Sequence, residues 1–522
     1  MAIGLIDRLR ATAKAARRAW AGKSERAYKG AEVNRLVEDW IATVLQPDDE
    51  TRWSLRRLRA RSRELSRNNP YMRGYRHSLG INVLGVSGPV LQAQVRNNPA
   101  AGETQGQLNK RINDRIEAAW TDWSRSPTTD GRLTLTRFQH LALKTVATDG
   151  EVFVRKRVGF DGNPYRFALE MIDADLLDEN YSEPGGGGRN EIRMGVEVDP
   201  TYGRPVAYHF FKRPPSMGSY VLDRYRVPAE EIIHLYDPDR ANQTRGVPWA
   251  VSVMWPLKML EGYMESTAVA ARLGASAMGF WTRKKDETVV GEVVPDPETG
   301  NITMDAAPGT FEFAPDGYEL ANWDPKQPNA QYDTFVKSKL REAATGLGID
   351  YNSFANDLEN VNYSSMRSGL LVARERWREL QDWWISSFLC PVYEEWLDAA
   401  LLSGALVLDS RNYQKFLAYK FFPRGWPWVD PEKDGKAGVI GIQTGLDSRT
   451  RLLAEKGLDL ETVLEDLKRE QEMAAEYGVD ISGPPAAAPF GGGGGGDQTT
   501  QGNAVDPTGR RNGHVRATAG RS

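Results

Sequence analysis

The sequence predicts a mixed α+β fold. Apolar residues at helical spacing, as in residues 109–123, alternate along the chain with short runs rich in β-branched and aromatic residues, as in residues 151–158. A hydrophobic content of 40% with 15 tryptophans is enough to build a packed core. The 522 residues allow two or three ordinary domains.

The first half of the chain is predicted to begin with helices and to continue with strands. Residues 1–70 are expected to be helical, with a long helix ending near Asn68-Asn69-Pro70. After Pro70 the pattern indicates short β-like runs, and Asp149-Gly150 marks a turn. The elements expected after Pro70 are β-like runs in 80–95, helices at 109–123 and 133–148, strands at 151–158 and 166–177, and a β-meander from 193 to about 240.

The sequence pattern in the second half of the chain predicts long helices on either side of a β-rich insert. A helix over 248–278 carries Pro256 near its start, which is expected to kink or shorten it. A helix starting at Ser365 carries an aromatic stripe, which is typical of core or of a subunit interface. The elements expected here are the helix 248–278, β-rich residues 279–330, a helix at 332–345, an acidic polar loop, the helix from Ser365 to about residue 405, and helices at 448–453 and 460–477. Residues after Ser482 are low-complexity.

Composition excludes some classes of protein. The net charge of −3 argues against tight DNA binding over the whole surface. The single cysteine, Cys390, cannot form an intrachain disulfide, and no apolar run reaches the roughly 20 residues that span a bilayer. Residues 1–22 form a basic amphipathic segment, expected to be a solvated or partner-bound helix; a membrane-surface helix is the alternative.

An arginine-rich segment lies between residues 52 and 76, with Glu64 as its only acidic residue. The pattern is typical either of a solvated or inter-subunit surface or of a nucleic-acid contact, and the sequence favours neither. The residues that carry this prediction are Arg56, Arg57, Arg59, Arg61, Arg63 and Arg67.

The motifs do not predict catalysis, a cofactor or a metal site. Asp173, Asp175 and Asp178 have the spacing that starts a calcium loop, but the expected glycine and final glutamate are missing, so turn chemistry is favoured. Ser364 and Ser365 have no nearby histidine or lysine, and helix capping is their expected role. A metal-dependent nucleic-acid-processing enzyme using the aspartates stays as the alternative.

The order of several segments over residues 25–475 resembles the lambda-like family of bacteriophage portal proteins. No segment is a catalytic fingerprint, but together in this order they are specific. The segments are RARSRELSRNNPYMRGY, VATDGEVFV, MIDADLLDE, IIHLYDPDRANQTRGVPW, REAATGLGIDYNSFANDLENVNYSSMRSG and WPWVDPEKDGKAG.

The resemblance implies a non-enzymatic ring, with twelve subunits in assembled family members, at the capsid portal vertex of the virion. It implies assembly in the host cytoplasm, double-stranded DNA in the channel, and contacts with the terminase large subunit, the capsid or scaffolding protein and head–tail connector proteins, without a membrane anchor. The implied layout is an N-terminal helix (1–24), a wing (25–246), a first stem helix (247–278), a clip (279–330), a second stem helix (331–347), a tunnel loop (348–364), a long helix and wing return (365–425), a helical crown (426–481) and a tail (482–522).

The resemblance places residues 348–364 at the narrowing of the channel. A conduit must touch a sliding polyanion without trapping it, and an amide-rich, acidic loop would repel more than it binds. Arg367 is expected to pair with a carboxylate of the loop or to contact phosphate. The expected channel residues are Asn352, Asn356, Asp357, Glu359, Asn360, Asn362, Tyr363, Ser364 and Arg367.

Overall fold

The computed structural model describes residues 44–99, 106–213, 223–276, 280–283, 318–321, 331–359, 363–426, 431–454 and 460–478. The expectations for residues 1–24, for most of 279–330 and for 482–522 lie outside these ranges. The chain divides into two compact units, Met1–Leu458 and Asp459–Ser522, and the second contributes helix α15 (Leu460–Tyr477).

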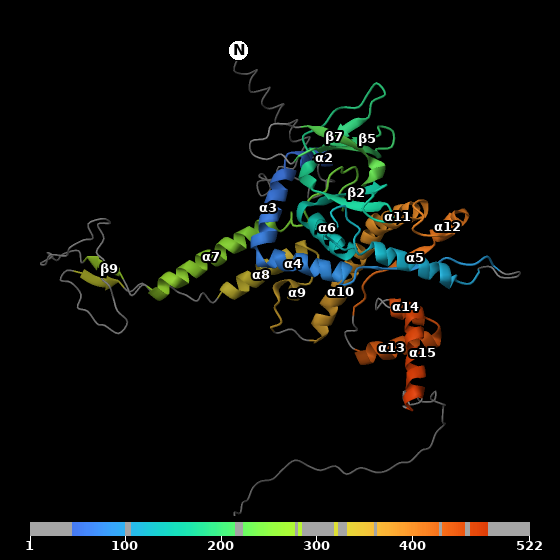
Figure 1. Cartoon of the computed structure of the whole chain (residues 1–522). Coiled ribbons are helices and arrows are strands. Elements are labelled where there is room, and N and C mark those ends of the chain that lie inside the picture. The colour runs from blue at the N-terminus through green and yellow to red at the C-terminus, as the bar shows by residue number, and fades with distance from the viewer. Residues whose placement is uncertain are drawn as a thin grey trace, which may run out of the picture. The chain divides into compact units, whose positions relative to one another are not determined.

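Helices fill the N-terminal part of the first unit (Figure 1). They are α2 (Pro47–Arg52), α3 (Leu55–Asn68) and α4 (Pro70–Leu79), and α4 continues into a π-helix, η3 (Gly80–Leu84). The end of α3 at Asn68 confirms the predicted helix stop. The prediction of β-like runs directly after Pro70 was wrong, because the Asn69 side chain accepts bonds from the N–H groups of Tyr71 and Met72 and so starts a new helix there. Of the predicted β-like run at 80–95, only Val90–Ala93 forms a strand, β1.

A three-stranded antiparallel sheet lies at the centre of this unit. Its order is β3 (Phe167–Ile172), β2 (Glu151–Val158), β8 (Ile232–Tyr236), and α6 (Leu135–Asp149) and α11 (Cys390–Leu402) pack on it. The predicted helix at 109–123 is α5 (Lys110–Trp123). Gly150 ends α6 at a φ of +91°, and a Cβ there would lie 2.4 Å from the carbonyl carbon of Val247, so only glycine fits this predicted turn.

The first part of the predicted meander forms a second antiparallel sheet with its own small core. Its order is β4 (Glu191–Arg193), β5 (Val196–Val198), β6 (Pro205–Phe211) and β7 (Arg224–Pro228). The prediction was wrong for the last strand of the meander, β8, which pairs with β2 in the central sheet. Phe153 of β2 joins the two sheets, since its ring lies 5.3 Å from that of Phe210 in an edge-to-face contact.

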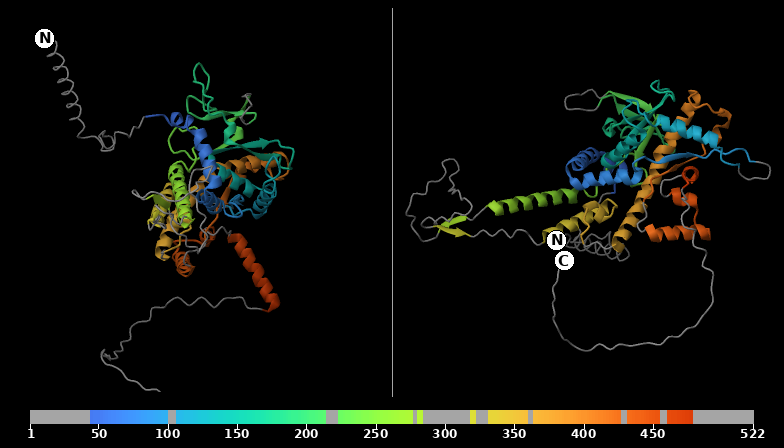
Figure 2. Two further views of the ribbon diagram at one scale, coloured as in Figure 1. Left: turned by 90° about the vertical axis from the view of Figure 1, so that its left-hand side faces the viewer. Right: turned by 60° about the horizontal axis from the view of Figure 1, so that its bottom comes forward.

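Helix α7 (Met254–Ser276) begins six residues later than the predicted start at Pro248. Pro256 lies in its first turn, so the helix is shortened at this proline, as predicted. The returning helix α8 (Tyr332–Gly346) lies beside it (Figure 2), and the Tyr263 ring contacts Phe335 at 4.6 Å between centroids. Between the two helices, β9 (Phe280–Arg283) pairs antiparallel with β10 (Tyr318–Ala321). A short helix, α9 (Tyr351–Ala355), follows α8.

The helix predicted to run from Ser365 to about residue 405 is interrupted. It consists of α10 (Tyr363–Trp384), a π-helix, η6 (Ile385–Leu389), and α11, and Pro391 in the first turn of α11 cannot donate to the preceding turn. Because α10 already begins at Tyr363, Ser364 and Ser365 lie inside the helix, and their predicted capping role was wrong. The aromatic stripe is core: Trp377, Trp384 and Trp396 are buried.

The chain then returns to the N-terminal part. After α12 (Tyr413–Phe416), strand β11 (Tyr419–Phe422) pairs antiparallel with β1. Helices α13 (Pro431–Thr444) and α14 (Arg449–Ala454) follow, and α13 was not predicted, because three glycines interrupt its helical spacing. No helix within the described ranges is apolar over enough length to cross a lipid bilayer.

A buried ion network joins α3 to the central sheet. The carboxylate of Glu151, at the start of β2, is fully buried; it pairs with the guanidinium of Arg59 and accepts a bond of 2.8 Å from that of Arg245, both also buried. The N–H of Gly246 and Nε2 of His234 complete its contacts, at 2.8 and 2.9 Å. Burial alone would raise the pKa of Glu151, but the two guanidiniums outweigh it and lower that pKa.

The network involves two of the arginines predicted as contact residues. Arg59 is 1% exposed and belongs to the Glu151 network, and Arg63 donates to both carboxylate oxygens of Asp149 at 2.7 and 2.9 Å. Both side chains bind carboxylates of the same chain, because the register of α3 turns them toward β2 and the end of α6. Arg59 is therefore buried inside its own chain, which corrects its prediction as a surface residue. Arg63, whose side chain is 33% exposed, is engaged by carboxylates of its own chain.

We expect the network to make stability depend on pH through His234. Burial lowers the pKa of His234, although Glu151 opposes the shift, so the folded ring is neutral near pH 7. Below pH of about 6.5 the unfolded chain takes up a proton that the folded ring resists, so stability should fall by up to about 1.4 kcal/mol per pH unit.

The measurement is the free energy of unfolding at several pH values for the wild type and His234→Gln. The glutamine can still donate to Glu151 but cannot titrate, so its curve should be flatter below pH of about 6.5. Parallel curves for the two proteins would show that His234 does not carry the dependence.

Candidate channel surface

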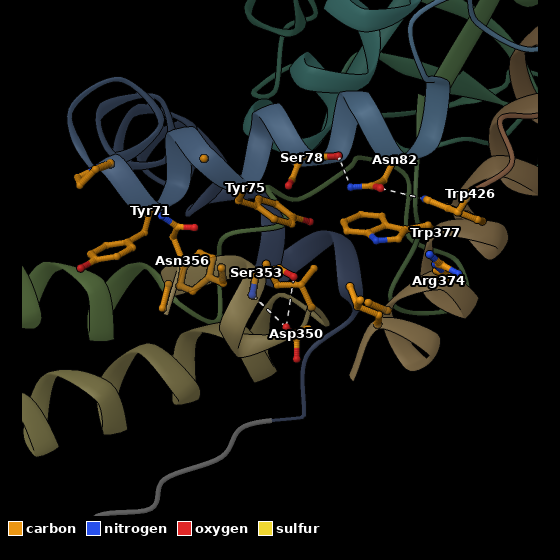
Figure 3. Close-up of a pocket in the computed structure, with 17 residues that line it drawn as sticks. Tyr71, Tyr75, Ser78, Asn82, Asp350, Ser353, Asn356, Arg374, Trp377 and Trp426 are labelled. Atoms are coloured by element: carbon orange, nitrogen blue, oxygen red, sulfur yellow. Dashed lines mark hydrogen bonds between the residues drawn. The ribbon is translucent and has the colours of Figure 1, made fainter. Parts of the chain in front are cut away.

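The segment 348–359 follows α8 and contains the short helix α9. Gly348 turns the chain at a φ of +66°, and Asp350 then caps α9, accepting from the N–H of Ser353 at 3.0 Å and from its hydroxyl at 3.2 Å (Figure 3). The sequence predicted a loop over 348–364; the structure instead places a short helix, Tyr351–Ala355, within it.

Two helices clamp the base of this segment. The buried Phe354 ring lies 5.7 Å from the ring of Tyr71 on α4. On the other side, α10 approaches so closely that a Cβ at Gly369 would lie 2.4 Å from Oδ1 of Asp350. The base of the segment is thus fixed by packing that involves residues far away in the sequence.

The acidic side chains Asp357 and Glu359 are bound by groups of the same chain. Asp357 accepts a bond of 2.7 Å from the hydroxyl of Tyr351 and another from the N–H of Glu359. These bonds lower the pKa of Asp357, and burial together with the bond to Asp357 raises the pKa of Tyr351 to about 12. Asp357 is therefore ionised at neutral pH.

Lys337 of α8 offsets part of this negative charge. Its Nζ lies 2.8 Å from Glu359, 2.9 Å from Asp333 and 3.8 Å from Asp357, and the first two contacts raise the pKa of Lys337. The segment is therefore less repulsive to a polyanion than its acidic residues suggest. Sequence reasoning missed Lys337, because nothing in its local pattern marks it as a partner of residues about twenty positions away.

The solvent-facing part of the segment is small and mixed in character. Ser353, Asn356, Leu358 and Glu359 are exposed, and Leu358 keeps 65% of its surface. Asn356 caps α9 in the left-handed region at a φ of +52°. Asn352 is half-buried.

The remaining predicted channel residues lie at the start of α10 or before it. Asn360 and Asn362 lie outside the described residues, and Tyr363 and Ser364 are placed only as backbone in the first turn of α10. Arg367 is half-buried in the following turn and has an interaction partner.

A pocket of about 500 Å³ lies behind the segment, between α4 and α10. Figure 3 shows Tyr71 at one end and Arg374 with Trp426 at the other. Its lining has no histidine, lysine or cysteine to activate Ser353 or Ser78 as a nucleophile. Across the described ranges, no group of three or more His, Cys, Asp or Glu side chains is arranged to hold a metal ion.

The aspartates weighed as metal ligands serve turns and ion pairs. Asp173 accepts a bond of 2.9 Å from the N–H of Asp175, and both carboxylates bind Arg63. Asp178 accepts from the N–H of Asn180 at 3.0 Å. The predicted turn chemistry is confirmed at these positions.

The other predicted arginines do form a surface. Arg56, Arg57, Arg61 and Arg67 are exposed on α3 and make no ion pair within the part of the chain that the structure describes. Trp53, just before α3, is 79% exposed beside Arg52. Like charges at i and i+4, as at Arg57 and Arg61, destabilise a helix slightly, so this face is built for an anionic neighbour or for solvent.

Comparison with known proteins identifies the chain's relatives. Residues 33–381 match the family described as "Phage portal protein, lambda family". The chain is 31% identical over 474 residues to the "Probable portal protein" of Halomonas phage phiHAP-1, covering 87% of this chain and 88% of that protein. It is 22% identical over 450 residues to "Portal protein B" of Escherichia phage lambda, covering 78% and 81%.

Solved structures also match this chain, at a lower sequence identity than the two portal proteins. A chain from the neck of an empty gene transfer agent particle matches with a TM-score of 0.42 and 13% identity, covering 81% of this chain and 98% of that one.

Proposed function

This chain belongs to the lambda family of phage portal proteins, and we propose that it assembles into a ring whose axial channel carries double-stranded DNA. It is a structural component of the virion at the portal, and the family is not enzymatic. The metal-dependent nucleic-acid-processing enzyme considered from the aspartates is therefore set aside.

The observation that carries the proposal is the construction of the 348–359 segment. Its base is clamped between α4 and α10, its carboxylates are partly offset by Lys337, and its tip exposes Leu358 rather than a cation. A surface that guides a moving duplex must hold its shape and add few phosphate contacts, because each contact increases affinity through counterion release. We assign the channel constriction to this segment, with Asn352, Asn356, Asp357 and Glu359, and to the adjoining Asn360, Asn362, Tyr363, Ser364 and Arg367.

An apolar stripe on α7 that no described residue covers supports ring assembly. Trp255, Met259 and Val269 lie on one face of this helix and are 73%, 54% and 51% exposed. Gly262, on the same face, has open space beside it. An exposed apolar stripe of this kind is typical of a protein–protein interface, and we assign it to the neighbouring subunit.

The proposed layout follows the family. We assign α7 and α8 to the stem, β9 and β10 to the clip, residues 25–246 with 365–425 to the wing, and residues 426–481 to the crown. The proposed ring has twelve subunits. The proposed partners are the terminase large subunit, head–tail connector proteins and the capsid or scaffolding protein. Arg56, Arg57, Arg61 and Arg67 stay candidates for contact with DNA or with a neighbouring subunit.

Leu358→Arg tests the channel assignment. An arginine at this exposed tip would add one phosphate contact per subunit, worth about 1 kcal/mol at roughly 0.1 M salt. Several such contacts around a ring would hold the duplex in place. We expect normal rings in negative-stain images and a fall of about tenfold or more in the DNA packaged in an in vitro packaging assay.

Leu358→Gln is the matched control, since it is polar and uncharged and should package close to the wild type. If the arginine and glutamine variants package equal amounts of DNA, the assignment of this segment to the channel is wrong. Monomers in the wild-type preparation would contradict the ring itself.

A further inference from the structure

A second pocket, of about 590 Å³, lies between α10, η6, β11 and Arg451 of α14. Five cations line it, and we call it the basic groove: Arg374, Arg378, Lys420, Arg424 and Arg451. It is separate from the 348–359 segment, although Arg374 and Trp426 border both this groove and the pocket behind that segment.

Aromatic rings orient the cations of the groove. The guanidiniums of Arg374 and Arg378 lie 5.8 and 5.9 Å from the centre of the Trp426 ring. The ammonium of Lys420 lies 5.0 Å from the Phe422 ring. Such stacking limits the motion of an arginine or lysine while its charge stays available to an anion.

Buried polar contacts stiffen the wall of the groove. The Gln381 amide, 3% exposed, donates to the carbonyl of Arg424 at 3.0 Å and to that of Asn82 at 3.1 Å. The Arg424 guanidinium donates to the carbonyl of Ile81 at 2.6 Å. These bonds fix the backbone that carries Arg424, so the groove is formed before any ligand arrives.

The charge of the groove is not balanced within its lining. Asp382 is the one acidic residue that lines it. Glu375 and Asp447 lie outside the lining and pair with Arg378 and Arg451. Among the described residues these are five cations and three carboxylates, and Arg374 and Arg451 have further interaction partners. Lys420 has no carboxylate partner among the described residues.

We propose that the basic groove binds the phosphate backbone of double-stranded DNA. This rests on the proposed function, which brings a duplex to the protein. A groove lined by four arginines and a lysine attracts a polyanion, and contacts to phosphates carry no sequence preference. An acidic protein segment is the other anion that could bind, but its charges are more widely spaced than the one phosphate per about 1.7 Å of duplex.

The test compares two double variants in full-length protein. Arg378→Gln with Lys420→Gln removes two exposed charges of the groove; Arg125→Gln with Arg132→Gln removes two exposed charges elsewhere. The probe is a fluorescein-labelled duplex of about 30 base pairs, with affinity measured by anisotropy between about 50 and 200 mM salt. Thermal unfolding of each protein verifies the fold, and Lys420→Gln alone serves if the double variant is unstable.

We expect the wild type and the control variant to bind alike. The groove variant should bind about tenfold more weakly or worse at roughly 0.1 M salt, with a salt slope shallower by about 0.9 for each phosphate that is no longer neutralised. Equal affinities and slopes for all three proteins would overturn the groove assignment. Binding of a labelled polyglutamate peptide that depends on the groove, with duplex binding unchanged, would also overturn it.

Negative-stain images of the same preparations separate this inference from the proposed function. Rings that bind the duplex equally in all three proteins would refute the groove alone. A wild type that forms no rings would refute the proposed function.

Discussion

Replacing Glu151 with alanine is expected to destabilise the folded chain by about 3–5 kcal/mol, because it leaves Arg59 and Arg245 buried without their shared carboxylate. Both guanidiniums are almost completely removed from water, and a buried cation without a partner is far more costly than the pair it came from. The loss is a large part of the about 5–15 kcal/mol that stabilises an ordinary domain. The destabilised variant should give a low yield of soluble protein and should unfold at a lower urea concentration than the wild type.

Glu170→Ala on the neighbouring strand β3 is the matched control. Glu170 pairs with Arg157, but both side chains are about a third exposed, at 34% and 38%, so water can solvate the arginine that remains. Its loss should cost less than about 1 kcal/mol. Similar destabilisation by the two variants would mean that the Glu151 network is not a special source of stability.

Replacing both Trp255 and Met259 with glutamate is expected to abolish rings while each chain stays folded. Burying one large apolar side chain is worth about 1.5–3 kcal/mol, and in a closed ring every subunit makes the contact. Two charges on this face would have to be desolvated at each interface. Light scattering should report monomers, and the thermal unfolding of the chain should change little, because both side chains are mainly exposed in the single subunit.

Leu402→Glu at the end of α11 controls for the loss of an exposed apolar side chain. Leu402 is 87% exposed and lies away from α7 in the sequence, so this variant should still form rings. Rings in the α7 double variant would move the subunit interface to another surface, and monomers in both variants would point to a general effect of added charge.

The candidate channel segment was only partly predictable. Its position after a returning helix, and its asparagine and acidic residues, were readable from the sequence. The short helix α9 and the start of α10 at Tyr363 were not, because Asp350 and Gly369 act through a close contact between two separate elements. Likewise, Lys337 offsets Glu359 only because α8 and the segment fold back on each other.

For the arginines of α3, too, the sequence predicted the helix but not which side chains are buried. Arg57 and Arg59 are two residues apart in the same arginine-rich run, yet one is exposed and the other 1% exposed. Local sequence assigns both to a helix, since that choice depends on residues within a few turns. Which one is buried depends on Glu151, 92 positions away, and on Arg245 beyond it.

The sequence by itself determined the kind of most major elements, the α+β class and the family, because helical and strand periodicity and the order of motifs are local properties of the chain. It missed α4 and α13, where a side-chain cap and interrupted helical spacing decided the outcome. Only the tertiary structure decided which charges are paired, where the basic groove lies and how the 348–359 segment is held. Those features depend on distances between residues that are far apart in sequence, and the free energy of a charge is set by burial and by its neighbours in space.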